Sequence, residues 1–188
     1  KYSKAQEYYN TYIEPSAILS AMAGFDKLVN GIVEKINNIL CPEKSEVRNN
    51  PYMAAAGTEI QADIYTYNSV SQQVLFDRYG REVTGTDNGD GTYSFSSGEK
   101  LYMSFGGAEV PVDSYTYSML DMDKTGYGMD DDKTVGTELF SRKGTDRYIK
   151  TTDNSGKTIY IRNNLNETDY ESLYKLGNLQ INPEAAQN

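Results

Sequence analysis

Residues 18–39 read ILSAMAGFDKLVNGIVEKINNI, and this stretch decides the first part of the fold. Its large apolar residues, here called the stripe, alternate in spacings of four and three: Ile18, Met22, Phe25, Val29, Ile32, Ile36 and Ile39. The same spacing separates the a and d positions of a coiled-coil helix. We therefore predict one long amphipathic helix from about Lys4 to Leu40. Pro15 disturbs this helix and Pro42 ends it.

The stripe predicts a packing partner, because a single helix cannot bury an apolar face against itself. Burying seven such side chains would contribute roughly 10–20 kcal/mol, at about 1.5–3 kcal/mol each. No other stretch of the chain has a comparably long amphipathic pattern. We expect the stripe to be partly exposed in this chain, or covered only by a second copy.

The apolar period changes from that of a helix to that of a strand in the second part of the chain. Residues 42–58 contain polar residues and helix breakers, which indicate a linker. From there the chain alternates, first through Ile60, Ala62 and Ile64. Strands are expected at residues 59–65, 74–79, 92–95, 100–105, 112–120, 137–142, 147–152 and 157–162. Gly-containing turns at 87–91 and 153–156 are typical of hairpins.

These patterns together predict an α+β chain. A long N-terminal, coiled-coil-like amphipathic helix precedes a mainly antiparallel β domain. We divide the chain into four contiguous regions: a helical segment at 1–41, the linker at 42–58, a β-rich domain at 59–181 and a return segment at 182–188.

Composition argues against several classes of function. The chain has 27 acidic and 18 basic residues and a net charge of -9, with no cluster of Lys and Arg. We therefore expect neither a nucleic-acid partner nor an anionic membrane surface, and no run approaches the ~20 apolar residues of a membrane span. Cys41 is the one cysteine and the chain has no His, so Cys41 reads as a buried structural thiol. We expect no enzyme and no cofactor.

Two groups of residues are candidates for ligand binding. Asp121, Asp123 and Asp132 have the spacing of positions 1, 3 and 12 in a calcium-binding EF-hand loop. No helices are expected beside that loop, so we interpret it as a solvated acidic loop and expect no metal, with the calcium site as the alternative. Four tyrosines at strand spacing form the second group: Tyr65, Tyr67, Tyr115 and Tyr117. These tyrosines could stack on sugars, or they could pack across the strands of a sheet.

Three segments carry a resemblance to a known family. Residues 25–37 read FDKLVNGIVEKIN, residues 136–144 read GTELFSRKG and residues 179–184 read LQINPE. The first resembles the long helix of bacterial flagellar hook-associated protein 1, in which a hydrophobic-Asp-x-Leu opening runs into an apolar stripe. The second resembles a segment found in members of that family from Clostridia-like bacteria. The third resembles the hydrophobic-x-Val/Ile-Asn-Pro stretch where the family's chain returns to its helical shaft.

The resemblance implies a structural, self-assembling protein of the extracellular bacterial flagellum, at the junction of hook and filament. Such proteins leave the cell through the flagellar export channel, and their partners are other copies and neighbouring axial proteins. Their terminal helices pack as coiled coils, while the middle of the chain projects as β domains. This chain would then be a central piece, and the helices that cover the stripe would lie outside it.

The residues themselves leave two other classes open. One is an extracellular adhesin or phage-type module whose β domain binds a glycan through Tyr and Asp. The other is a hydrolase that uses paired carboxylates.

Overall fold

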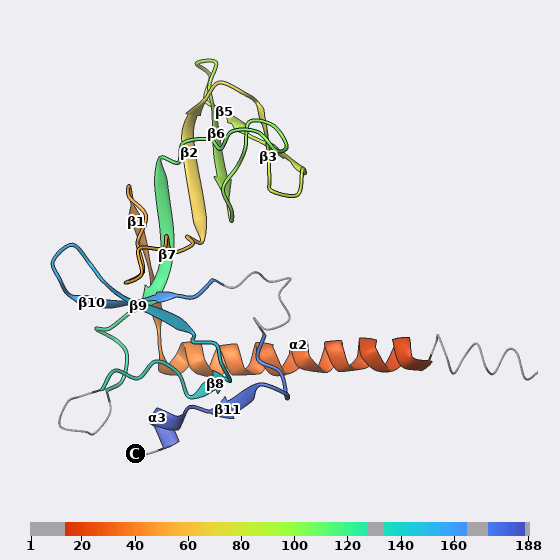
Figure 1. Ribbon diagram of the computed structural model, residues 1–188, viewed down its shortest axis with the longest axis vertical. Coiled ribbons are helices and arrows are strands. Elements are labelled where there is room, and N and C mark those ends of the chain that lie inside the picture. The colour runs from red at the N-terminus through yellow and green to blue at the C-terminus, as the bar shows by residue number, and fades with distance from the viewer. Residues whose placement is uncertain (1–13, 128–133, 165–172, 187–188) are drawn as a thin grey trace, which may run out of the picture. The chain divides into compact units, whose positions relative to one another are not determined.

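The computed structural model describes residues 14–127, 134–164 and 173–186. One helix is followed by mainly antiparallel sheets, which confirms the predicted α+β class (Figure 1). The chain divides into two units, each built from separated stretches. Unit 1 contains residues 1–42, 124–147 and 165–188. Unit 2 contains residues 43–123 and 148–164.

This division differs from the four contiguous regions expected from the sequence. The chain passes between the units four times: after Pro42, Asp123, Arg147 and Asn164. Residues 124–147 and 165–188 were assigned mostly to the β domain, but they belong to the unit of the helix. A local period shows that a segment is a strand. It does not show with which distant segments of the chain that strand shares a unit.

Unit 2 contains a seven-stranded antiparallel sheet. Its order is β5-β6-β2-β7-β10-β9, and β1 also pairs with β7. The strands are β1 (Glu43–Arg48), β2 (Ile64–Val70), β5 (Thr86–Asp87), β6 (Tyr93–Ser97), β7 (Ser114–Leu120), β9 (Tyr148–Thr152) and β10 (Thr158–Arg162). A separate pair is formed by β3 (Val74–Phe76) and β4 (Glu82–Thr84). The hairpin expected around residues 153–156 joins β9 to β10, with Gly156 at φ +82°.

Two local predictions are corrected by the sheet. β1 lies within the stretch predicted to be a linker, and it pairs with β7 from Glu43 to Arg48. Its sequence EKSEVR lacks an alternating apolar pattern because an edge strand pairs through its backbone and tolerates charged side chains. Residues 100–105 do not form the expected strand. Tyr102 makes only isolated bridges, to Phe76 and Glu109.

Tyrosines form much of the core of unit 2. All four candidate tyrosines are buried, and Tyr65 lies opposite Tyr115 with the ring centroids 5.6 Å apart. The prediction that they pack across strands is confirmed, and they are not available to stack on sugars. Ile64, which the alternation placed with Ile60 and Ala62, is instead 41% exposed. The reason is that β2 begins at Ile64 after a bend at Asp63, which shifts the inward positions to Tyr65 and Tyr67.

Three of the core tyrosines also bind loop backbone with their hydroxyl oxygens. The Leu101 N–H donates to Tyr67 at 2.8 Å and the Tyr52 N–H donates to Tyr117 at 2.9 Å. The Ala62 N–H donates to Tyr65 at 3.1 Å. Each of these hydrogen bonds lets a loop enter the apolar core without leaving a buried donor unpaired.

Tyr67→Phe should lower the free energy of unfolding by about 1–3 kcal/mol, because the buried Leu101 N–H loses its acceptor. Urea unfolding followed by far-UV circular dichroism measures this loss. Tyr115→Phe is the matched control. That tyrosine is also buried, but its hydroxyl makes no hydrogen bond to any residue in the described ranges. Equal losses in the two variants would contradict the proposed role of the hydroxyl.

Unit 1 contains α2 (Glu14–Leu40), β8 (Phe140–Arg142), β11 (Leu179–Ile181) and the short α3 (Pro183–Ala186). The predicted helix start near Lys4 lies outside the described residues. Pro15 stands in the first turn of α2, where proline is tolerated. β11 pairs antiparallel with β8. Cys41 is buried with its Sγ 3.3 Å from the Gly136 carbonyl oxygen, as expected for a structural thiol.

Candidate functional site

The side of α2 that unit 1 buries is a mixed polar row beside the stripe. Asp26, Val33 and Asn37 are buried and Asn30 is partly buried. At 3.6 residues per turn this row lies about 100° around the helix from the stripe. The polar row therefore contacts the other segments of unit 1. This leaves the side chains of the stripe available for a different contact.

Asn37 is the centre of that row. Its fully buried side chain donates from Nδ2 to the Phe140 carbonyl at 2.8 Å. Its Oδ1 accepts the backbone N–H groups of Leu139 and Phe140, each at 3.0 Å. One amide side chain thus satisfies three backbone groups of an extended segment, much as a neighbouring strand would.

Asn182 binds the same segment. Its backbone N–H donates to the Leu139 carbonyl at 2.8 Å, and its Nδ2 donates to the Glu138 carbonyl at 2.9 Å. Further along the helix, Asn30 Oδ1 accepts the Tyr174 N–H at 2.9 Å. Residues 138–140 are therefore hydrogen-bonded to one asparagine of the helix and to one of the return segment.

Charged side chains complete the buried network of unit 1. Arg147 is 1% exposed and donates to Glu34 Oε2 at 3.2 Å. The Tyr174 hydroxyl donates to Glu138 Oε2 at 2.7 Å. Burial and the adjacent Glu138 charge raise the pKa of Tyr174 to about 12. These groups bond to one another, so the network holds the segments of unit 1 together.

The stripe itself is largely exposed. The exposed fraction is 53% for Ile18, 57% for Met22, 50% for Phe25, 51% for Ile32 and 77% for Ile39. Val29 and Ile36 are partly buried, and Leu28 adds another side chain that is 58% exposed. The expectation that the stripe is partly exposed is confirmed, whereas its role as an interface stays a prediction. We call Ile18, Met22, Phe25, Leu28, Ile32 and Ile39 the open face.

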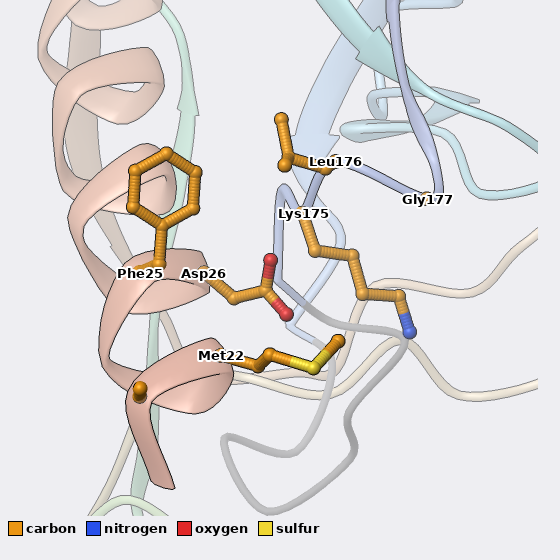
Figure 2. A pocket seen from close by; sticks show the side chains of 7 residues that line it. Met22, Phe25, Asp26, Lys175, Leu176 and Gly177 are labelled. Atoms are coloured by element: carbon orange, nitrogen blue, oxygen red, sulfur yellow. The ribbon is translucent and has the colours of Figure 1, made fainter. Parts of the chain in front are cut away.

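A hollow of about 590 Å³ adjoins the open face, between α2 and residues 175–177 (Figure 2). Met22, Phe25 and Leu176 give it apolar walls. Figure 2 shows the Asp26 side chain extending from the helix toward the segment that carries Lys175. The hollow therefore extends the exposed apolar surface of α2 onto Leu176, which is 66% exposed.

The helix also meets a simple criterion for a membrane span. Within Ser16–Leu40 an 18-residue window has a mean hydropathy of 1.2, and 11% of that window is buried. However, the same stretch carries four charged side chains: Asp26, Lys27, Glu34 and Lys35. Its buried row binds the backbone of other segments, and charged side chains are costly within a bilayer. These features favour an amphipathic helix that packs on protein.

The candidate calcium loop is described only in part. The Asp123 N–H donates to Asp121 Oδ1 at 3.2 Å, which is a local turn contact. Asp132 lies outside the described residues. Within the described ranges no group of three or more His, Cys, Asp or Glu side chains could hold a metal ion. The choice between a calcium site and the expected solvated acidic loop therefore stays untested.

The apolar pattern of the sequence does not reveal that the polar row is a packing surface. A signal was present, because Asp26, Asn30, Val33 and Asn37 recur at spacings of four, three and four, parallel to the stripe. Polar residues on a helix are normally taken to face solvent, so the periodicity of apolar residues alone selects the stripe.

Comparisons with known proteins do not identify the chain. No family model matches it, and neither curated proteins nor solved structures yield a match.

Proposed function

We propose that this chain is a structural piece of an extracellular bacterial flagellar protein of the hook-associated protein 1 type. It acts by self-assembly, with the open face of α2 packing against helices of other chains in the manner of a coiled coil. Unit 2 is the β domain that the resemblance places outside the helical shaft. The open face is the observation that carries this proposal.

The open face has the properties of a helix-packing surface. Its six large apolar side chains are each half or more exposed, and all of them except Leu28 belong to the stripe with its spacings of four and three. Covering the exposed half of six such side chains would contribute roughly 4–9 kcal/mol, at about 1.5–3 kcal/mol for each complete burial. The contacts that α2 makes through Asn30 and Asn37 hold the helix in its unit without using this face.

The three segments that carry the resemblance also support the proposal, because they meet within unit 1. Asn37 from the first binds Leu139 and Phe140 from the second. Asn182 from the third binds the same second segment, and β11 pairs with β8. Segments that resemble one family and are distant in sequence thus form a single packed structure.

Ile32→Asp should weaken reversible self-association at least about tenfold, because a charge on the open face must be desolvated when helices pack. Sedimentation equilibrium of the variant beside the unchanged chain measures this effect. Ser20→Asp is the matched control, since it adds the same charge at an exposed position on the opposite side of the helix. The β signal in circular dichroism should be unchanged in both variants.

Three outcomes would count against the proposal. Monodisperse monomers for both the unchanged chain and Ile32→Asp would mean that the open face does not associate. Cosedimentation with lipid vesicles that Ile32→Asp abolishes would assign the face to a membrane. Specific binding on a glycan array would favour the adhesin or phage-type module.

A further inference from the structure

The hairpin turn between β5 and β6 contains an Asn-Gly pair, Asn88 and Gly89. Both residues are exposed, and Gly89 has a φ of +81°. A Cβ built at Gly89 would meet nothing within 4 Å, so there is open space around this part of the backbone. In an Asn-Gly pair the glycine nitrogen can attack the side-chain amide carbon of the asparagine, because glycine has no side chain that hinders the approach.

A carboxylate lies on the nitrogen that would attack. The Gly89 N–H donates to Asp87 Oδ1 at 2.8 Å. A general base must lie within hydrogen-bond reach of the proton that it removes, at about 2.6–3.2 Å between heavy atoms. An amide nitrogen becomes a good nucleophile when it loses this proton, so Asp87 is placed to activate Gly89.

A hydroxyl lies on the oxygen of the amide that would be attacked. Ser94 Oγ donates to Asn88 Oδ1 at 2.8 Å. Attack at the amide carbon moves negative charge onto this oxygen, and a donor held at about 2.7–3.1 Å stabilises such a charge. Asn88 Nδ2 donates to the Asn68 carbonyl at 2.8 Å and to Thr92 Oγ1 at 2.9 Å, which fixes the amide in the turn.

The chain contains a second Asn-Gly pair that lacks this arrangement. Asn30 and Gly31 lie within α2, where a backbone N–H donates to the carbonyl four residues earlier. Asn30 Oδ1 accepts the Tyr174 N–H at 2.9 Å. The amide of Asn30 therefore has a donor on its oxygen, but the nitrogen of Gly31 is held by the helix and not by a carboxylate.

We propose that Asn88 is a self-modification site, at which the turn converts the asparagine to aspartate and isoaspartate with water as the co-reactant. The Gly89 nitrogen bonds to Asn88 Cγ as its proton passes to Asp87, and the Cγ–Nδ2 bond breaks. The departing nitrogen takes up one proton and leaves as ammonia. Water then opens the succinimide ring on either side of the Gly89 nitrogen, which gives the two acids. This site does not depend on the function proposed for α2.

The reaction loosens one edge of the sheet in unit 2. The Asn88 amide, which donates to the Asn68 carbonyl in β2, is replaced by a carboxylate that cannot donate and that repels this carbonyl. β5 is two residues long and pairs with β6 alone among the described strands. The Asn88 N–H donates to the Thr92 carbonyl at 3.0 Å, and its hydrogen should exchange faster in the modified chain.

Peptide mapping by mass spectrometry of the full 188-residue chain, incubated at neutral pH, should show deamidation at Asn88 and not at Asn30. Asp87→Asn should slow the reaction at least about tenfold, because the new amide still accepts the Gly89 N–H but is not a base. Ser94→Ala should also slow it at least about tenfold, as expected when a donor to the developing oxyanion is lost.

Two matched controls should leave the rate at Asn88 unchanged. Asp153→Asn removes the same charge in the other hairpin, where Asp153 accepts the Ser155 N–H at 2.8 Å. Ser96→Ala removes an exposed hydroxyl from the strand that carries Ser94. Ammonia released in an amount equal to the modified Asn88 gives an independent readout.

The unfolded chain separates an assisted site from an ordinary Asn-Gly pair. In urea at the same pH, Asn88 should react more slowly than in the folded chain, and at a rate similar to that of Asn30. Asn88 that stays unmodified in the folded chain would overturn the proposal. Equal rates at Asn88 in the folded and unfolded chains would do the same, as would a rate that neither Asp87→Asn nor Ser94→Ala lowers.

Discussion

Asn37→Leu should lower the free energy of unfolding of unit 1 by about 3–5 kcal/mol. The substitution roughly keeps the side-chain volume, but the Leu139 N–H, the Phe140 N–H and the Phe140 carbonyl lose their partner. Each buried backbone group left unsatisfied costs about 1–3 kcal/mol, and partial relaxation reduces the sum. Urea unfolding measures the total loss. Hydrogen exchange at the two amides locates it.

Lys35→Leu is the control for the Asn37 variant, because it places leucine at an exposed position of the same helix. Its effect on stability should stay within about 0.5 kcal/mol, as for most surface substitutions. If the Leu139 and Phe140 amides exchange no faster in Asn37→Leu than in Lys35→Leu, the asparagine does not hold residues 138–140 to the helix.

Alkaline pH should unfold unit 2 in one cooperative step. Burial raises the pKa of Tyr67 and Tyr117 to about 12, from the ordinary value near 10. Between these values the unfolded chain releases phenol protons that the folded chain retains, so stability falls as pH rises. Below pH ~10 the contribution is fully present. Parallel titrations of phenolate absorbance and far-UV circular dichroism measure the transition.

The slope of stability against pH tests the tyrosine assignment. Each buried tyrosine contributes up to about 1.4 kcal/mol per pH unit in this range. Tyr117→Phe removes one such group, so its stability should fall less steeply between pH ~10 and ~12 than that of the unchanged chain. An unchanged slope, or phenolate formation by the buried tyrosines in a chain that keeps its β signal, would contradict the prediction.

The tyrosines also show where strand periodicity predicts the buried face of a strand and where it does not. The alternation of residues 112–120 places β7 and the inward positions of Tyr115 and Tyr117 without tertiary information, because a side-chain period of two is a property of the strand itself. In β2 the same rule selects the wrong face, since one bend at Asp63 reverses every later position.

The local sequence determined those features of the fold that depend only on the residues of a single helix or turn. The spacing of the stripe predicts α2 up to Leu40 and five of the six open-face residues, because a helix projects residues three and four apart to one side. The residues at 153–156 predict the hairpin of β9 and β10 through the backbone freedom of Gly156. The candidate interface on the helix could therefore be located from the sequence alone.

Only the tertiary structure decided which distant segments meet. Asn37 binds residues 102 and 103 positions further along the chain, and β1 pairs with β7 although its sequence has no strand pattern. The contact of Phe105 with Gly80 likewise joins two turns that have no shared local signal. Such pairings depend on shape and on backbone hydrogen bonds between separated segments, which no local period of apolar residues records.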